Sequence, residues 1–402
     1  MPIPNAGPEP LFERKSPLEV LLWALVSAGL LFSLISISLV QVFLGLAVVC
    51  LAILLILRRR RLRLPPFAWP LGAYVLLSLA ASALSRDPAT SFIDCKELLL
   101  TLAVPLVLAA FVSARSMNLG LWAFLASAAA AAGYSLAVYL IRMTPGERVA
   151  GFMGHYMTQA GLLMLFSAAA LALALFLQDK SRWVWTLGLA LSLPALALTL
   201  TRSAWIGLLA AACVLLLIRK PKALLLLPVL AGLFFLAAPK PMKQRALSIF
   251  STYGASSQER IAYIKAGLKI IGNYPWHGTG PNTAEVIFQY PEYGLSDQAK
   301  KNVHLHNNVI QIAAERGLPA LAAWLAFLAV ALVGLIKMLK ASSGPLRALA
   351  AAGIAALVAL FIGGMFEYNF GDSEIACLFY ILITLPYARR NLGRREDMPS
   401  EP

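Results

Sequence analysis

Charged residues are scarce in this chain of 402 residues. They make up 13% of it, whereas 60% of the residues are hydrophobic and the mean hydropathy is +0.75. A soluble protein of this composition would expose far too much apolar surface to water. The composition therefore excludes a soluble globular protein and indicates a polytopic membrane protein.

Cysteine is also rare, and several familiar motifs are missing. The four cysteines fall in or at the edge of apolar runs, with no paired or ligand-like spacing: Cys50, Cys95, Cys213 and Cys377. This excludes a disulfide framework and a cysteine-based zinc site, so we expect packing residues. There is no GxxxxGK phosphate loop and no internal repeat. The N-terminal stretch lacks a cleavable signal pattern and is expected to be a short cytoplasmic tail before an uncleaved span.

Apolar runs long enough to cross the membrane as helices recur along almost the whole chain. Open sheets cannot satisfy their backbone groups in lipid, so we predict an all-α protein with about twelve transmembrane helices. The predicted spans are 17–36, 39–57, 67–85, 96–113, 119–141, 157–177, 183–200, 203–218, 223–238, 308–338, 346–366 and 373–388. The tenth is too long to be a membrane span alone, so part of it should project into water.

Basic residues alternate between the predicted loops, and short cytoplasmic loops collect positive charge. With the N-terminus inside, the cytoplasmic segments hold Arg14, Lys15, Arg58 to Arg61, Arg63, Arg115, Lys180, Arg182, Arg219, Lys220, Lys222, Lys337, Lys340, Arg347, Arg389, Arg390, Arg394 and Arg395. Both termini are then cytoplasmic. Topological anchoring accounts for this charge, so the net charge of +15 does not indicate nucleic-acid binding.

The longest stretch outside the predicted membrane spans runs from 239 to 307, on the outer face. We therefore divide the chain into a region of spans (1–238), a large outer loop domain (239–307), and the last three spans with a cytoplasmic tail (308–402). Within the loop, helical spacing of apolar residues predicts a helix that Ser257 caps and that ends at Asn273 and Pro275. A second short helix is expected near 283–289.

Four basic residues on the outer face have unusual settings: Arg202, Arg260, Arg148 and Lys96. Arg202 lies in the apolar turn LTLTRSAWIG, and Arg260 belongs to the helix of the large loop. Arginine near a low-dielectric membrane is costly unless an anion meets it, and its planar fork matches phosphate oxygens. The set predicts an anionic ligand. The alternative for Arg148 and Lys96 is an ion pair with Glu147 or Glu97, or snorkelling at the interface.

All four histidines fall on the outer face, and two lie in the segment HLHNN. His304 and His306 precede a predicted helix whose first turn holds Asn307 and Asn308. A helix N-terminus disfavours protonated histidine, so a neutral imidazole could serve there as a general base. Because the two are separated by one residue, they should point in different directions if the segment is extended. A backbone-capping role is the alternative.

Together, HLHNN with Glu315 and Gly317, the large basic loop and the TRSAW turn resemble the O-antigen ligase and polymerase superfamily. This resemblance implies a metal-independent membrane glycosyltransferase of the GT-C type without a cofactor. It implies a glycan donor linked to undecaprenyl pyrophosphate, in the bacterial inner membrane, with a periplasmic active site. In the ligase branch the acceptor is a sugar hydroxyl of lipid A-core, and the reaction inverts the configuration in lipopolysaccharide biosynthesis.

With that reaction in mind, we assign Arg202 and Arg260 to the pyrophosphate, with Arg148 and Lys96 as helpers. His306 is the favoured base and His304 a near-equal candidate. The residues expected to line the substrate site are His155, His277, Asn307 and Glu315. The outer-face aspartates Asp87, Asp94, Asp297 and Asp372 stand apart along the sequence, so no DxD-type metal site is predicted.

Other functions share part of this pattern. O-antigen polymerase and protein O-oligosaccharyltransferase would use the same donor, so pyrophosphate-binding residues cannot separate them from a ligase. The single large outer loop favours the ligase. A lipid-linked glycan flippase or transporter would need polar groups at mid-membrane depth, where the predicted spans carry few charges.

Overall fold

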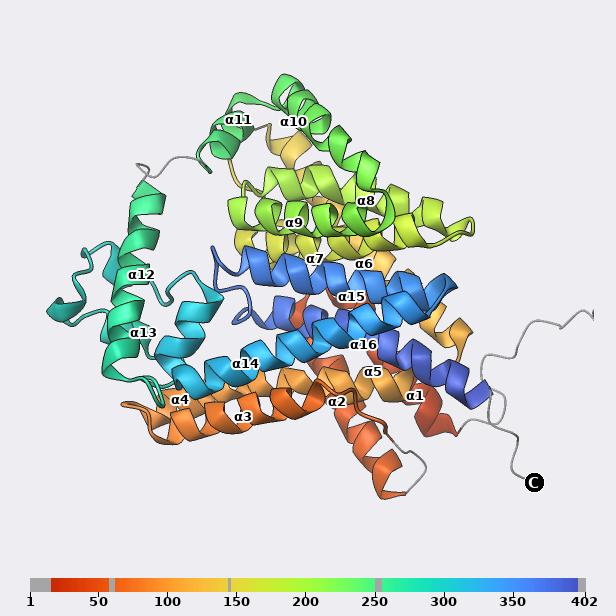
Figure 1. Cartoon of the computed structure of the whole chain (residues 1–402), viewed down its shortest axis with the longest axis horizontal. Coiled ribbons are helices and arrows are strands. Elements are labelled where there is room, and N and C mark those ends of the chain that lie inside the picture. Colours follow the sequence, from red (N-terminus) through yellow and green to blue (C-terminus); the bar gives the residue numbers. More distant parts are fainter. Residues whose placement is uncertain (1–15, 58–61, 144–145, 250–254, 397–402) are drawn as a thin grey trace, which may run out of the picture.

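The computed structural model describes residues 16–57, 62–143, 146–249 and 255–396, and within these ranges the chain forms helices and no β-strand (Figure 1). The α-helices are α1 (Pro17–Phe32), α2 (Ile37–Ile56), α3 (Ala68–Ala83), α4 (Pro88–Asp94), α5 (Ala103–Ala110), α6 (Ala114–Arg142), α7 (Tyr156–Phe176), α8 (Ser181–Leu198), α9 (Arg202–Arg219), α10 (Leu226–Ala237), α11 (Lys240–Leu247), α12 (Ala255–Asn273), α13 (Ala284–Ile287), α14 (Asn308–Ala341), α15 (Gly344–Gly363) and α16 (Ser373–Glu396). Short 3-10 helices are η1 (Cys95–Leu102), η2 (Gly151–Met153), η3 (Pro221–Leu225), η4 (Pro291–Tyr293) and η5 (Ala299–Lys301).

The all-α prediction is confirmed, and each predicted span coincides with an apolar helix or helical run. In the part of the chain that the structure describes, seven helices are long and apolar enough to cross a membrane: α2, α6, α7, α8, α9, α14 and α15. Shorter apolar helices include α1, α3 and the run from η3 through α10. The chain is therefore a polytopic membrane protein, while the count of twelve spans stays a prediction. The same holds for the GT-C architecture.

The orientation argument rests partly on residues outside the described ranges. Arg14, Lys15 and Arg58 to Arg61 lie there, and the side chains of Arg394 and Arg395 are not described either. The division into three regions and the sidedness of the loops remain predictions.

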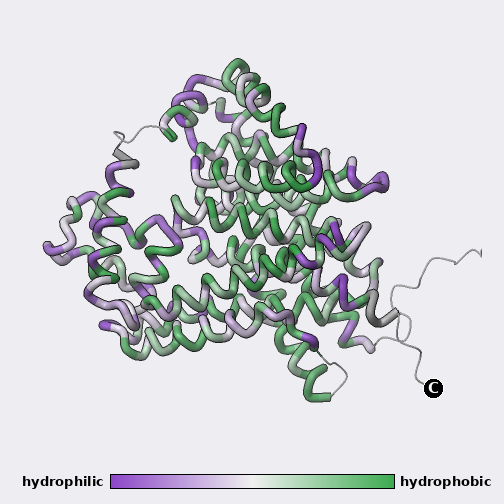
Figure 2. The backbone as a smooth tube through the Cα atoms, in the orientation of Figure 1, coloured by the Kyte–Doolittle hydropathy of each residue, from purple (hydrophilic) through white to green (hydrophobic). Residues whose placement is uncertain are grey.

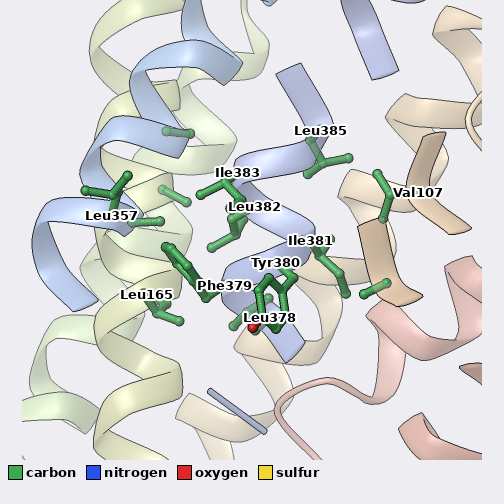
Figure 3. Close-up of a cluster of buried hydrophobic side chains, with 14 of the residues drawn as sticks. Val107, Leu165, Leu357, Leu378, Phe379, Tyr380, Ile381, Leu382, Ile383 and Leu385 are labelled. Carbon is green, nitrogen blue, oxygen red and sulfur yellow. The ribbon is translucent and has the colours of Figure 1, made fainter. Parts of the chain in front are cut away.

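The interior of the bundle is built around α7, which packs on α8, α9 and α15 and is buried along most of its length. Helix α16 packs against α5, α7 and α15. In Figure 3 its residues from Leu378 to Leu385 lie between Val107 of α5, Leu165 of α7 and Leu357 of α15. Burial of these side chains provides a rigid frame for the loops at the end of the bundle.

The segment from α11 to α13 lies at one end of the bundle, where Figure 2 shows hydrophilic residues gathered around α12. It has a small apolar core of its own, in which Tyr263 and Ile270 of α12 pack with Phe288 and with Ala314 of α14. The predicted helix ends at Asn273 as expected. The prediction that Ser257 caps it is wrong, because the helix already includes Ala255. The second predicted helix is α13.

A break in α14 joins this segment to the bundle. Gly317 has φ 81° and ψ 167°, a conformation open essentially to glycine alone, so the chain kinks there. The kink frees carbonyl groups that the loop uses: Thr279 N–H donates to Ala314 O (3.0 Å) and Gly280 N–H to Glu315 O (2.9 Å). The first turns of α14 therefore pack with the loop, and the remainder runs along α3 and α15.

Candidate active site

A buried carboxylate, Glu367, contacts both histidines of HLHNN and an arginine of α12. Its Oε1 lies 2.8 Å from His306 Nδ1 and 3.8 Å from His304 Nε2. Its Oε2 lies 3.5 Å from a terminal nitrogen of Arg260. Only 9% of the Glu367 side chain is exposed. The carboxylate thus links two imidazoles to a cation in a desolvated setting.

The two asparagines of HLHNN hold this arrangement together. Asn307 caps α14, accepting from the N–H of Ile310 at 3.0 Å, and its amide donates to Met365 O at 2.9 Å. Asn308 donates to the side chain of Asn369 at 2.7 Å and accepts from the N–H of Phe370. Both asparagines therefore fix the α15–α16 loop, which carries Glu367, against the start of α14.

The two histidines were expected to point apart only in an extended segment, and the segment is not extended. His306 has φ 52°, in the left-handed region, so the segment is turned rather than extended. The turn brings the two imidazole centroids to 4.3 Å in an edge-to-face contact, with both rings near the same carboxylate oxygen.

Burial and nearby charges shift the pKa of the His304 imidazole and of the Glu367 carboxyl group to different extents. Burial lowers the pKa of His304 to about 4, and the nearby Glu367 only partly opposes this effect, so this imidazole is neutral at ordinary pH. Burial alone would raise the pKa of Glu367. The hydrogen bond with His306, together with electrostatic interactions with the two histidines and Arg260, outweighs this effect and holds the pKa of Glu367 below its usual value. Glu367 is therefore ionised.

Four arginines from separate segments gather beside this site. Burial, followed by the positive charges of Arg148, Arg202 and Arg260, lowers the pKa of Arg245 on α11 to about 10. Arg245 donates its Nε–H to Leu200 O at 3.0 Å, and Arg202 donates to Ser248 O at 2.7 Å and Ser248 Oγ at 3.2 Å. These bonds pin α11 to the turn before α9. We call Arg148, Arg202, Arg245 and Arg260 the arginine cluster.

Arg148 belongs to this cluster rather than to its neighbouring acid. Its guanidinium lies 4.3 Å from the ring centroid of Tyr156, whereas Glu147 forms an exposed ion pair with Arg142 at 3.7 Å. Mutual repulsion among the four cations, concentrated where burial reduces screening, is relieved when a multivalent anion binds.

Lys96 lies elsewhere. It is the second residue of η1, close to Asp94 and Glu97, and lines an apolar groove between α2 and the η1–α5 segment. The structure therefore does not bring Lys96 together with the arginine cluster, and its predicted contact with pyrophosphate remains a proposal.

His155 and His277 lie in different parts of the structure. His155 precedes α7, approaches Thr158 Oγ1 at 3.3 Å, and lines a small cavity of about 60 Å³ together with His304 and Glu367. His277 lies in the turn that packs against Gly317, and its Nδ1 is buried without a hydrogen-bond partner in the described structure. Of these two predicted lining residues, His155 is at the site and His277 is at the kink of α14.

A second cavity, of about 360 Å³, lies on another side of His304 and is acidic. It is lined by Asp94, Glu97, Asn282, Val303, His304, Gln311, Glu315, Tyr368, Gly371, Asp372, Ser373 and Glu374. The aspartates Asp94 and Asp372, which stand apart in the sequence, therefore share one cavity. Glu315 is buried there and pairs with Arg316 at 2.9 Å, and Arg316 also pairs with Asp94 at 3.3 Å.

His304, His306 and Glu367 together could also hold a metal ion, because their ligand atoms lie within 4.8 Å of one another among the described residues. The setting of the carboxylate does not favour this. Oε2 of Glu367 already faces the Arg260 guanidinium, whose charge would repel a divalent cation bound to the same group. The fit to a metal is therefore poor.

Part of the chain that carries this site matches the model of a known protein family. Residues 187–325 match the family model described as O-antigen ligase. Over this segment the chain is similar to the O-antigen ligase family. A comparison with curated proteins gave no match. The matched segment contains three residues of the arginine cluster and both histidines of HLHNN, while Arg148 and Glu367 lie outside it.

The sequence alone did not identify Glu367, Arg245 or Arg316 as residues of the site. A signal existed for the first two. Glu367 is one of two acids, with Asp372, in the short outer loop between the last two predicted spans, and Arg245 belongs to the same large loop as Arg260. The sequence holds no such signal for Arg316. Like Arg148, it is an arginine that follows a glutamate, so its local sequence does not set it apart.

Proposed function

We propose that this protein is an O-antigen ligase of the bacterial inner membrane. It transfers a glycan from undecaprenyl pyrophosphate to a sugar hydroxyl of lipid A-core, with inversion and without a metal ion. The observation that carries the proposal is the arginine cluster beside the histidine–carboxylate group, because transfer from a pyrophosphate needs both charge neutralisation and a base.

The arginine cluster receives the pyrophosphate. As the bond between the anomeric carbon and the pyrophosphate oxygen breaks, negative charge grows on the leaving group. Cations fixed by backbone contacts, as Arg202 and Arg245 are, stabilise that charge without moving during the reaction. They supply the electrostatic contribution that a divalent cation supplies in other glycosyltransferases.

His306 takes the proton of the acceptor hydroxyl. Its Nδ1–H donates to Glu367, which leaves Nε2 with a free electron pair and stabilises the imidazolium that forms. The hydroxyl oxygen bonds to the anomeric carbon from the face opposite the departing pyrophosphate, which inverts the configuration. The low pKa of His304 makes it a weaker base. His304 lines both cavities and positions the acceptor.

The sidedness follows from the charge pattern of the loops. The site lies at the end of the bundle that carries α11 to α13, which we place in the periplasm, with both termini in the cytoplasm. Donor and acceptor are both lipids, so the reaction takes place at the membrane surface.

A competition among acceptors tests this function. The purified full-length protein is given undecaprenyl-pyrophosphate glycan together with lipid A-core, free glycan repeats on the same lipid, and an acceptor protein. Ligated lipid A-core should be the dominant product. Products formed only by lengthening the donor glycan would make the protein a polymerase, and labelled protein would make it a protein O-oligosaccharyltransferase.

A further inference from the structure

The small cavity of about 60 Å³ lies between the arginine cluster and the two histidines of HLHNN. On one side it is lined by Thr201 and Ser203, the two residues that flank Arg202. On another side it is lined by His304 and Glu367. A water molecule needs a space of about 10–15 Å³ with polar partners, so the cavity has room for a few waters but not for a sugar ring. Water, rather than an acceptor sugar, fits this cavity.

His155 lines the same cavity and is held by a chain of two hydrogen bonds. Thr158 donates its hydroxyl hydrogen to Asp372 Oδ2 at 2.8 Å. A hydroxyl has only one hydrogen to donate, so the contact of 3.3 Å between Thr158 Oγ1 and His155 Nδ1 needs the imidazole as the donor. Neutral His155 then carries its hydrogen on Nδ1 and a free electron pair on Nε2. Nε2 is therefore the ring nitrogen that can take a proton from a molecule in the cavity.

The proposed base of the ligation reaction, His306, is oriented in the same way. Its Nδ1 faces Glu367 at 2.8 Å, and its Nε2 is left free. An oxygen that accepts from Nδ1–H fixes both the tautomer and the direction of a histidine base. The residue after His155 is Tyr156, whose ring centroid lies 4.3 Å from the guanidinium of Arg148. A second oriented imidazole thus lies beside the arginines that are proposed to bind the pyrophosphate.

The larger cavity, of about 360 Å³, adjoins the small one. His304, Tyr368 and Asp372 line both cavities. The larger cavity has the volume that a sugar needs, and the smaller has the volume that water needs. Two nucleophiles of different size therefore have separate places next to the same leaving group.

We propose that the protein also hydrolyses its glycan donor when no acceptor is bound, with water in the small cavity as the nucleophile and His155 as the base. This inference rests on the proposed function for the identity of the donor. The water oxygen bonds to the anomeric carbon, and one water proton moves to Nε2 of His155. The bond from that carbon to the pyrophosphate oxygen breaks, and its electron pair leaves with the pyrophosphate. The products are a free glycan and undecaprenyl pyrophosphate.

Hydrolysis is measured with purified full-length protein in nanodiscs and undecaprenyl-pyrophosphate glycan, without lipid A-core. Mass spectrometry should find free glycan and undecaprenyl pyrophosphate in equal amounts, formed at least about tenfold faster than without protein. Saturating lipid A-core should suppress free glycan at least about tenfold, because a bound acceptor orients its hydroxyl at the same carbon. Free glycan at the rate of the protein-free sample overturns the proposal. So does glycan phosphate as the product, since it would mean attack at phosphorus.

Substitutions separate a base from a structural residue. His155→Asn keeps a side-chain N–H that can donate to Thr158 but has no basic nitrogen. It should lower hydrolysis at least about a hundredfold and leave ligation within about twofold of wild type. His306→Gln should do the reverse. His277→Asn, at the kink of α14, is the matched control and should change neither rate.

An equal fall of both rates in His155→Asn would assign His155 a structural role and overturn the proposal. If His155→Asn does not fold, His155→Gln, which also lacks a basic nitrogen, takes its place with the same expected rates. Ligated lipid A-core without free glycan in any sample would retain the ligase function and reject hydrolysis. Free glycan without any ligated product would retain hydrolysis and reject the ligase function.

Discussion

His306 Nδ1 lies 2.8 Å from Oε1 of Glu367, although 61 residues separate them in the chain. The same carboxylate faces Arg260 through its other oxygen. One buried acid therefore orients the proposed base and connects it to the arginine cluster. This relationship gives Glu367 a role that follows from its contacts with residues distant in the sequence.

Replacing Glu367 with glutamine tests that role. The amide keeps the size of the side chain but cannot stabilise an imidazolium, so Glu367→Gln should lower the rate of glycan transfer at least about a hundredfold. The measurement is single-turnover product formation with saturating donor. Glu292→Gln, an exposed acid on η4, is the matched control and should retain full activity. A rate near wild type for Glu367→Gln removes the carboxylate from the mechanism.

Burial of His304 predicts how stability depends on pH. Its pKa of about 4 in the folded state is below the ordinary value of 6.5, so the unfolded chain binds the proton more readily. Lowering the pH from about 6.5 to about 4 should therefore cost up to about 3 kcal/mol of stability, with no further loss from this group at lower pH. Thermal unfolding in detergent checks this. His304→Gln should show a smaller fall in Tm, and an identical fall would contradict the assignment.

Arg245→Gln should weaken binding of the donor without lowering the stability of the protein. Removing one cation relieves repulsion in the arginine cluster, so the unliganded protein should keep or raise its Tm. The KM for donor should increase about tenfold, because a charge-assisted bond is lost. Arg142→Gln, which removes an exposed ion-pair partner, should change neither. A donor KM unaffected by Arg245→Gln would exclude this residue from the pyrophosphate site.

Replacing Gly317 tests whether the kink of α14 depends on a glycine at this position. At Gly317→Ala the new Cβ lies 2.3 Å from Trp276 O, at a φ that alanine avoids, so we expect a loss of about 1–3 kcal/mol in the free energy of unfolding. Gly272→Ala on α12 is the control. Its Cβ meets nothing within 4 Å, and alanine favours the helix, so its Tm should be unchanged or higher. Equal Tm values for both variants would show that the kink needs no glycine.

The helices could be predicted because their cause is local. Twelve apolar runs correspond to apolar helices, and Asn307 caps α14 because its side chain reaches an N–H three residues away. The sequence also grouped Arg148, Arg202 and Arg260 with Lys96 on one predicted face of the membrane; the structure brings the three arginines near one another, and Lys96 lies elsewhere. These features depend on composition, periodicity and sidedness.

The rest depends on contacts between distant segments. Glu367 reaches the histidines because Asn308 binds Asn369, a pairing with no local signature. The left-handed conformation of His306 results from the same packing, and an extended segment was the natural assumption. The shared cavity of Asp94 and Asp372 likewise arises only when α4 meets the α15–α16 loop. Tertiary structure, rather than residue type, determines these positions.

The most direct test of the account measures undecaprenyl pyrophosphate released per ligated glycan, with purified protein, lipid A-core and excess chelator. The account predicts one released pyrophosphate lipid for each product, at a rate equal to that without chelator. Loss of product in chelator, restored by a divalent cation, would assign His304, His306 and Glu367 to a metal and contradict the metal-free mechanism.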